Sequence, residues 1–425
     1  MLFRSYKASS AAQEMDADSW METGQTLLEN GAFEEANVAF NKALEIYNGS
    51  IEADPQDSKA WVGVGDALSR MTDFGWDREK FNSSLEAYER ALEIDPENVD
   101  AWIGKGRILC NTEFAVVDGV LYDDGRHNES LEAFERALEI DPSNPGAWKG
   151  KAFALSVLGR IDESLAAFDK AIERLPVNQS DEIAYVFAAK GNVLQYTPGR
   201  QEEAIAAFDM ALATGSENCS DMILVLNGTA LKDLGRYNES VEAFDEILEL
   251  NSSNINVWID NADALVAADR LEEAEKAYGE AETRAATNQT LAQVWLSKAV
   301  TLRGLGRFDE AISTYDRAIE LYLICDSSGD LYPGYAKIQI SFAWDGKGDA
   351  LNQTGRYEEA VRAYDRAIEF SPSEFAMYRS MIYAKKSALL EKVGRHEEAL
   401  EAFDKAVEIS PEYAPAWQEV VSSSH

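Results

Sequence analysis

Two short blocks of sequence, repeated along the chain, decide the fold. The first block has Trp, a small residue and Leu at fixed spacing, as in WVGVGDAL (61–68), WIGKGRIL (102–109), WKGKAFAL (148–155) and WDGKGDAL (344–351). The second appears as SLEAYERALEIDP (84–96), SLEAFERALEIDP (130–142), SLAAFDKAIERLP (164–176) and AVRAYDRAIEFSP (360–372). Where nothing is inserted, the blocks recur every 34 residues, as from Pro142 to Pro176. Such a fixed period is typical of repeat proteins whose units stack on their neighbours.

Each block has the spacing of an amphipathic helix. In the first block, Trp, Gly or Ala, and Leu lie at i, i+4 and i+7, and the second block places Ala or Ser, an aromatic residue and Ala at the same spacing. Glycines between the blocks, such as Gly159, permit the positive φ that ends a helix, and a proline such as Pro176 ends the second helix. The sequence therefore predicts an all-α chain of helix pairs without a sheet. Only 114–122 and 338–343 have strand-like patterns.

The pattern W-x3-[GA]-x2-L … G-x4-[AS]-x3-[FY]-x2-A-x4-P resembles the tetratricopeptide repeat (TPR). Ten such repeats begin near residues 17, 58, 99, 145, 184, 221, 255, 292, 341 and 380. The resemblance implies one right-handed α-solenoid superhelix over 17–411, between an N-terminal extension, 1–16, and a lone C-terminal helix, 412–425. Insertions interrupt the period near 46–54, 71–82, 111–124 and 321–340. We expect them to be longer helices and turns, with an aromatic docking ledge as the alternative.

Composition and motif spacing exclude several functions. The 425 residues include 76 Asp and Glu against 39 Lys and Arg, and the net charge of −37 argues against nucleic-acid binding. No apolar run reaches the roughly 18–20 residues of a membrane-spanning helix. The three cysteines lie far apart, and the three histidines have no partner at motif spacing. We therefore predict a non-enzymatic protein without a metal or cofactor.

In the TPR family, the first helices of the repeats line a groove that binds peptides or partner helices. The resemblance places the residues one and five positions after the Trp in this groove. They include Asp66, Arg107, Lys149, Phe153, Asp263, Asp345 and Asp349. Because these residues are mixed in charge and acidic near the ninth repeat, we expect a basic or amphipathic protein or peptide partner.

Sequons for N-linked glycosylation, Asn-x-Ser/Thr, are enriched. Half of the 20 asparagines stand in one, whereas the composition predicts about two by chance. The ten are Asn48, Asn82, Asn128, Asn178, Asn218, Asn227, Asn238, Asn251, Asn288 and Asn352. Sequons are used only outside the cytoplasm. The enrichment predicts N-linked glycans on an extracellular or cell-surface protein whose signal is not in this chain, with the cytoplasm as the alternative. At Asn82, Asn128 and Asn238, capping of the second helix is a competing explanation.

Apolar residues occur at both ends of the chain. Leu2, Phe3 and Tyr6 precede the first repeat, and Trp417, Val420 and Val421 lie in the last expected helix. Solenoid ends without a polar cap expose such residues to a second copy. We therefore expect head-to-tail self-association into filaments, with folding of the last helix onto the tenth repeat as the alternative.

Overall fold

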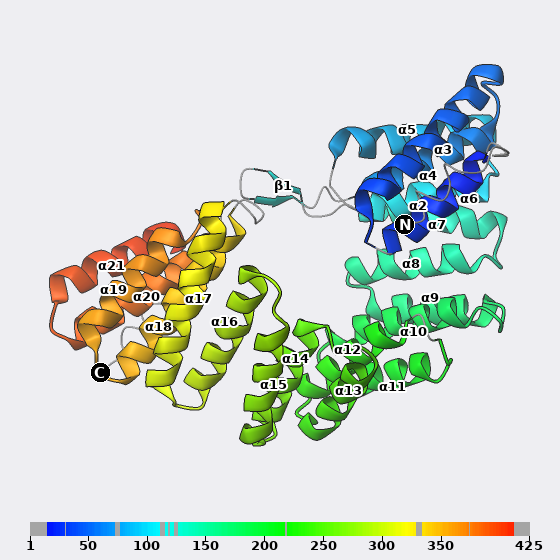
Figure 1. The fold of residues 1–425 in the computed structure, drawn as a ribbon. Coiled ribbons are helices and arrows are strands. Elements are labelled where there is room, and N and C mark those ends of the chain that lie inside the picture. The colour runs from blue at the N-terminus through cyan, green and yellow to red at the C-terminus, as the bar shows by residue number, and fades with distance from the viewer. Residues whose placement is uncertain are drawn as a thin grey trace, which may run out of the picture. The chain divides into compact units, whose positions relative to one another are not determined.

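The computed structural model describes residues 15–29, 31–72, 77–110, 115–117, 120–122, 126–216, 219–328, 334–373 and 375–411. Within these ranges, twenty α-helices follow one another as ten consecutive pairs (Figure 1). The predicted all-α solenoid of helix pairs is confirmed. No helix in these ranges is both long and apolar enough to cross a membrane.

The two helices of each pair differ in their role. The first helices are Ala17–Glu29 (α2), Ser58–Thr72 (α4), Val99–Cys110 (α6), Pro145–Val157 (α8), Ser180–Gln195 (α10), Ser220–Asp233 (α12), Ile255–Ala267 (α14), Asn288–Gly304 (α16), Tyr335–Gln353 (α18) and Ala376–Lys392 (α20). The second helices are Phe33–Ala53 (α3), Arg78–Ile94 (α5), His127–Ile140 (α7), Ile161–Arg174 (α9), Gln201–Leu212 (α11), Tyr237–Leu250 (α13), Leu271–Arg284 (α15), Phe308–Ser328 (α17), Tyr357–Phe370 (α19) and His396–Ile409 (α21).

The aromatic residue of a second helix can fill the space between consecutive first helices, as Tyr88 and Phe134 do. Tyr88 of α5 is completely buried, and its ring lies against glycines of both α4 and α6. A Cβ added to Gly65 would lie only 2.6 Å from the Tyr88 ring, and one added to Gly104 would also overlap it. Small residues in the first block therefore allow close packing of the aromatic ring.

The starts of the second helices exclude one explanation of the sequons. Asn82, Asn128 and Asn238 lie inside α5, α7 and α13, so capping of these helices, the competing explanation of their sequons, does not hold. In most repeats an Arg precedes the helix and binds the Glu three residues later. The pairs are Arg160–Glu163, Arg200–Glu203, Arg236–Glu239, Arg270–Glu273, Arg307–Glu310, Arg356–Glu359 and Arg395–Glu398.

The insertions take different forms. Helix α3 extends to Ala53 and so includes all but the last residue of the insertion 46–54, as expected, and 321–340 mainly extends α17 and α18. The insertion 111–124 contains a two-stranded sheet, Ala115–Val117 (β1) and Val120–Tyr122 (β2), so the prediction of no sheet is wrong there. The other strand-like stretch, 338–343, is helical. In the insertion 71–82, residues 73–76 lie outside the described residues.

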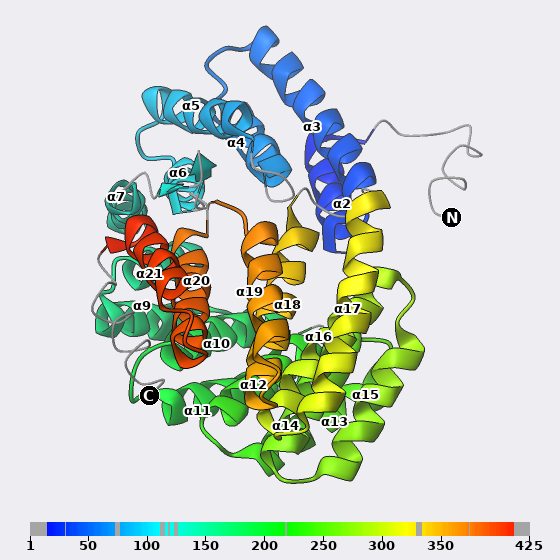
Figure 2. The same cartoon turned by 90° about the vertical axis from the view of Figure 1, so that its left-hand side faces the viewer.

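The chain divides into two compact units within the fifth repeat. The first comprises 1–116, 121–203 and 213–217, and the second comprises 117–120, 204–212 and 218–425. Helices α2 to α10 belong to the first unit and α12 to α21 to the second. In the second unit, α16 to α20 each pack against the next helix along the chain (Figure 2).

Candidate interaction grooves

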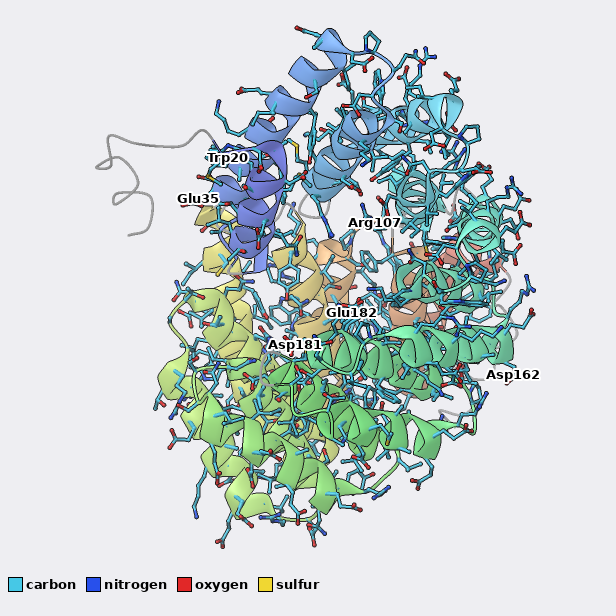
Figure 3. All side chains as sticks on the ribbon, turned by 90° about the vertical axis from the view of Figure 1, so that its right-hand side faces the viewer. Trp20, Glu35, Arg107, Asp162, Asp181 and Glu182 are labelled. Atoms are coloured by element: carbon cyan, nitrogen blue, oxygen red, sulfur yellow. The ribbon has the colours of Figure 1, made fainter. Side chains whose placement is uncertain are left out.

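Two predicted groove residues of the first unit form an ion pair between neighbouring repeats. Arg107 Nη2 on α6 lies 2.6 Å from Asp66 Oδ1 on α4, and Tyr88 Oη donates to the same oxygen at 2.7 Å. Figure 3 shows Arg107 on the inner side of this unit and Asp162 at its outer edge. The pair therefore links two first helices on the groove side.

The other two predicted groove residues of the first unit lie on α8 and have separate partners. Lys149 forms an ion pair with Glu182 of α10, and its Nζ lies 5.3 Å from the ring centroid of Tyr185. The half-buried Phe153 instead packs edge-on against Phe168, with ring centroids 5.3 Å apart. Lys149 is therefore engaged between repeats, whereas Phe153 belongs to the core of its own repeat.

In the second unit, Asp345 and Asp349 of α18 join one network of charges across three repeats. Lys385 Nζ of α20 lies 2.9 Å and 3.0 Å from the two Asp345 oxygens and 3.0 Å from Asp349 Oδ2. Arg303 of α16 also binds Asp349. Burial raises the pKa of Asp345, while the two carboxylates raise the pKa of Lys385 against the opposing effect of burial. Two cations balance two anions, so the expectation of an acidic groove near the ninth repeat is wrong.

Asp263 of α14 accepts a hydrogen bond from the tyrosine of the second helix, a pairing that the sequence analysis missed. Tyr278 Oη donates to its carboxylate, as does Thr301 Oγ1 at 3.1 Å, and burial raises the pKa of Asp263. The aromatic residue of the second helix is a Tyr in this repeat, and an Asp stands five residues after the Trp. The same combination occurs in the pairs Tyr88–Asp66, Tyr278–Asp263 and Tyr364–Asp349. A search for Tyr and Asp together would have found these pairs in the sequence.

A concave surface of the first unit carries an excess of negative charge. A groove of about 710 Å³ is lined there by residues of α2, α3, α4 and α6 and of the turns before them. Its carboxylates are Asp16, Asp18, Asp57, Asp66, Asp95 and Asp100, and Lys59 is the one Lys or Arg among its lining residues. We call this surface the acidic groove. Asp66 is the one predicted groove residue that lines it.

Helix caps and one tyrosine hold the carboxylates of the acidic groove in place. Asp16 Oδ1 accepts a hydrogen bond from Ser19 N at 2.9 Å at the start of α2, and hydrogen bonds from Ser19 lower the pKa of Asp16. Tyr47 Oη donates to Asp18 Oδ1 at 2.6 Å, and burial together with this contact raises the pKa of Tyr47. Ile46 and Val62 add apolar surface to the same groove.

The sequon asparagines differ in exposure. Seven are exposed: Asn48, Asn82, Asn128, Asn178, Asn238, Asn251 and Asn288. Asn227 is buried, and its Nδ2 donates to Asp209 Oδ1 at 3.0 Å. The folded chain therefore does not accommodate a glycan on Asn227, which corrects that prediction. Asn352 is half-buried.

Several predicted residues lie outside the described residues. They are Asn218 and the residues proposed for end-to-end contact, Leu2, Phe3, Tyr6, Trp417, Val420 and Val421. Head-to-tail association therefore stays a prediction. Within the described ranges, no group of three or more His, Cys, Asp or Glu residues is placed to hold a metal ion.

Family models of the tetratricopeptide repeat match most of the chain. They match residues 4–51, 76–111, 121–182, 231–294, 292–323 and 339–412. The protein therefore belongs to the TPR family. As a TPR protein it is a scaffold for protein–protein interaction, in a family that is generally non-enzymatic.

Three solved structures illustrate the similarity. Yeast Tom70 is 15% identical with a TM-score of 0.49, and the match covers 96% of this chain and 95% of that one. TTC0263, a TPR protein of Thermus thermophilus, is 17% identical over 51% of this chain and 98% of its own, with a TM-score of 0.38. YrrB, a TPR protein with an unusual peptide-binding site, is 22% identical over 47% and 100%, with a TM-score of 0.35. The comparison with curated proteins gave no match.

Proposed function

We propose that the acidic groove of the first unit binds a basic segment of a partner protein. The observation that carries this proposal is the presence of six carboxylates and one lysine along a groove of about 710 Å³. Such a surface attracts a Lys- or Arg-rich segment and disfavours an acidic one. The apolar side chains of Ile46 and Val62 favour contact with the aliphatic stems of Lys and Arg.

The charge network of the second unit supports the choice of the first unit. Asp345 and Asp349 already have Lys385 and Arg303 as partners. A basic peptide would have to displace one of these cations. Asp18 and Asp100, by contrast, are exposed in the acidic groove, and neither forms an ion pair with a described Lys or Arg. A basic partner can therefore bind Asp18 and Asp100 without displacing a cation.

The test is a fluorescence-anisotropy titration of a labelled Lys-rich peptide with the full chain at low and moderate salt. A double variant, Asp18→Asn with Asp100→Asn, should weaken binding about fivefold, since each exposed charge pair contributes roughly 0.5 kcal/mol. The matched control, Glu86→Gln with Glu132→Gln, removes the same charge from exposed positions of α5 and α7. Equal weakening by both variants would show that only the net charge of the chain acts, which contradicts the proposal. Binding that does not weaken as the salt concentration rises would show that charge does not contribute, which also contradicts it.

The second part of the proposed function is a location outside the cytoplasm, at the cell surface or in the medium. Ten sequons among 20 asparagines favour it, and seven of them are exposed in the fold. Protease treatment of intact source cells, with immunodetection of the cell and medium fractions, tests this location. A chain that is protected in intact cells and absent from the medium would contradict it and favour the cytoplasm.

A further inference from the structure

We propose that Asn178 and Asn251, in the turns between consecutive repeats, are the N-glycosylation sites of the folded protein. The inference rests on the proposed location outside the cytoplasm, because sequons are used only there. Among the seven exposed sequon asparagines, these two are the ones that lie outside the helices.

Asn251 stands where other repeats have aspartate. Its Oδ1 accepts hydrogen bonds from Ser253 N at 3.1 Å and from Ser253 Oγ at 2.6 Å. At the equivalent turn, Asp141 Oδ1 accepts the same two bonds from Ser143 at 3.0 Å and 2.6 Å. The turn therefore needs only an acceptor oxygen, which a carboxylate supplies equally well. What Asn251 adds is an exposed amide nitrogen.

Asn178 has lost the structural role of its equivalents. Asn98 and Asn144 stand two residues after a proline. The Oδ1 of each accepts a hydrogen bond, 3.0 Å long, from the backbone N–H of the residue three positions later. Asn178 also stands two residues after a proline, but α10 begins only at Ser180, after Gln179. The Asn178 side chain is exposed and makes no hydrogen bond with the described residues. Its amide therefore does not cap the following helix.

Packing explains most other exposed sequons without a glycan. After Asn82, Asn128 and Asn238, the sequon serine is completely buried. Its Oγ donates to a first-helix carbonyl in each case, in the pairs Ser84–Gly65, Ser130–Gly106 and Ser240–Gly228. After Asn288, Thr290 forms a capping box with Thr287. After Asn48, Ser50 lines the acidic groove. These five asparagines lie inside helices, and their hydroxyl residues have packing, capping or groove positions, so their sequons do not support the inference.

The modification requires an accessible Nδ2. This nitrogen attacks the anomeric carbon of a lipid-linked oligosaccharide, and a C–N bond forms as the bond from that carbon to a phosphate oxygen breaks. The amide loses one proton, and the lipid phosphate leaves with the bonding electrons. Asn178 and Asn251 present exposed amides for this step. Asn227, whose Nδ2 is buried against Asp209, is an internal negative control.

Glycopeptide mass spectrometry of the protein purified from its native source tests the inference. We expect an intact mass above the 47.0 kDa of the chain, with glycan on the peptides that contain Asn178 and Asn251 and none on the Asn227 peptide. Asn251→Asp should remove one glycan and leave the melting temperature of the deglycosylated protein unchanged, because Asp141 forms the same turn. Asn178→Asp should remove the other.

Two results would overturn the inference. One is a native protein in which both peptides are unmodified. The other is equal occupancy of Asn227, which would mean that exposure in the fold does not select the sites. Bare asparagines on a chain that is recovered outside the cytoplasm would refute these sites and leave the proposed location intact. Peptide binding by the acidic groove is measured separately on unmodified protein, so its failure is distinguishable from both.

Discussion

Two tyrosines at the same repeat position predict opposite effects of the same substitution. Tyr364 Oη donates to Asp349 Oδ1 at 2.8 Å. The equivalent hydroxyl of Tyr315 is buried and has no hydrogen-bond partner among the described residues, because Val300 stands where the ninth repeat has Asp349. Both side chains are at most 1% exposed. Replacement by Phe therefore removes one oxygen from each site and leaves the ring packing unchanged.

The expected magnitudes follow from the hydrogen bonds. Tyr364→Phe should lower the free energy of unfolding by about 1.5–2 kcal/mol, since it removes a buried hydrogen bond to a carboxylate that keeps its two cations. Tyr315→Phe should leave stability unchanged or raise it by up to about 1 kcal/mol, because it removes a buried hydroxyl whose loss of hydration is uncompensated. The two variants should thus differ by about 1.5–3 kcal/mol, despite their identical chemistry.

Hydrogen exchange measured by mass spectrometry is the appropriate assay, because repeats couple mainly to their neighbours and a single melting temperature averages over the solenoid. Peptides from α17 to α19 should exchange roughly 10- to 30-fold faster in Tyr364→Phe, since 1.4 kcal/mol corresponds to a factor of ten. Peptides from α4 and α5 should be unaffected and serve as the internal reference. Tyr88→Phe should show the reverse pattern, because Tyr88 donates to Asp66 in the first unit.

A second substitution tests the cause directly. Val300→Asp places a carboxylate where Tyr315 lacks a partner, and Val300 is 47% exposed, so the change costs little packing. It should stabilise the protein by about 1 kcal/mol when Tyr315 is present and not in the Tyr315→Phe background. The reasoning is refuted if Tyr315→Phe destabilises as much as Tyr364→Phe, or if Val300→Asp has the same effect in both backgrounds.

Further predictions concern a glycine pair and a buried carboxylate. Gly150→Ala should destabilise the protein by about 1–3 kcal/mol, because the added Cβ would overlap the Phe134 ring. Gly279→Ala should stabilise it by about 0.5–1 kcal/mol, because the added Cβ meets open space in a helix. Urea titrations of both variants measure the two changes in the free energy of unfolding. Burial raises the pKa of Asp263 above its usual 3.8, so its charged form costs stability at neutral pH, and that cost disappears as the pH falls through the raised pKa. Asp263→Asn should therefore have a higher melting temperature than the parent protein at pH 7, and the difference in melting temperature should shrink towards pH 4. A difference that grows on acidification would contradict the predicted direction.

The helix pairs and their turns were predictable because they depend on local sequence. The spacing of Trp, glycine and leucine determines which face of the first helix is buried. Gly159 follows α8 with a φ of 72°, a backbone conformation that glycine adopts without strain. The starts of the second helices were predictable in principle. The Gly-Arg pair is followed by Glu three residues after the Arg, as in Arg356 and Glu359, and this spacing marks the start of the second helix.

The charge pattern of the grooves was not predictable from the repeat motif. Asp345 and Lys385 are 40 residues apart in the chain, and Asp349 and Arg303 are 46 apart. Their contacts depend on how adjacent first helices are placed, which repeat periodicity does not specify. Family groove positions alone therefore assign a carboxylate to the groove without showing whether a cation of the next repeat already neutralises it.

We expect the pairing of acidic residues with cations, rather than their number, to decide where a charged partner binds. The net charge of −37 is spread over the whole chain, and most exposed carboxylates contribute only a screened field. In the second unit Lys385 and Arg303 neutralise Asp345 and Asp349, so a basic partner gains little at these two carboxylates. In the first unit Asp18 and Asp100 line the acidic groove without a described cation as ion-pair partner, although neither occupies a groove position of the family motif. The position that the motif does mark, Asp66, is already bound to Arg107. We therefore propose that basic recognition occurs in the first three repeats rather than in the ninth, at residues beside the motif positions.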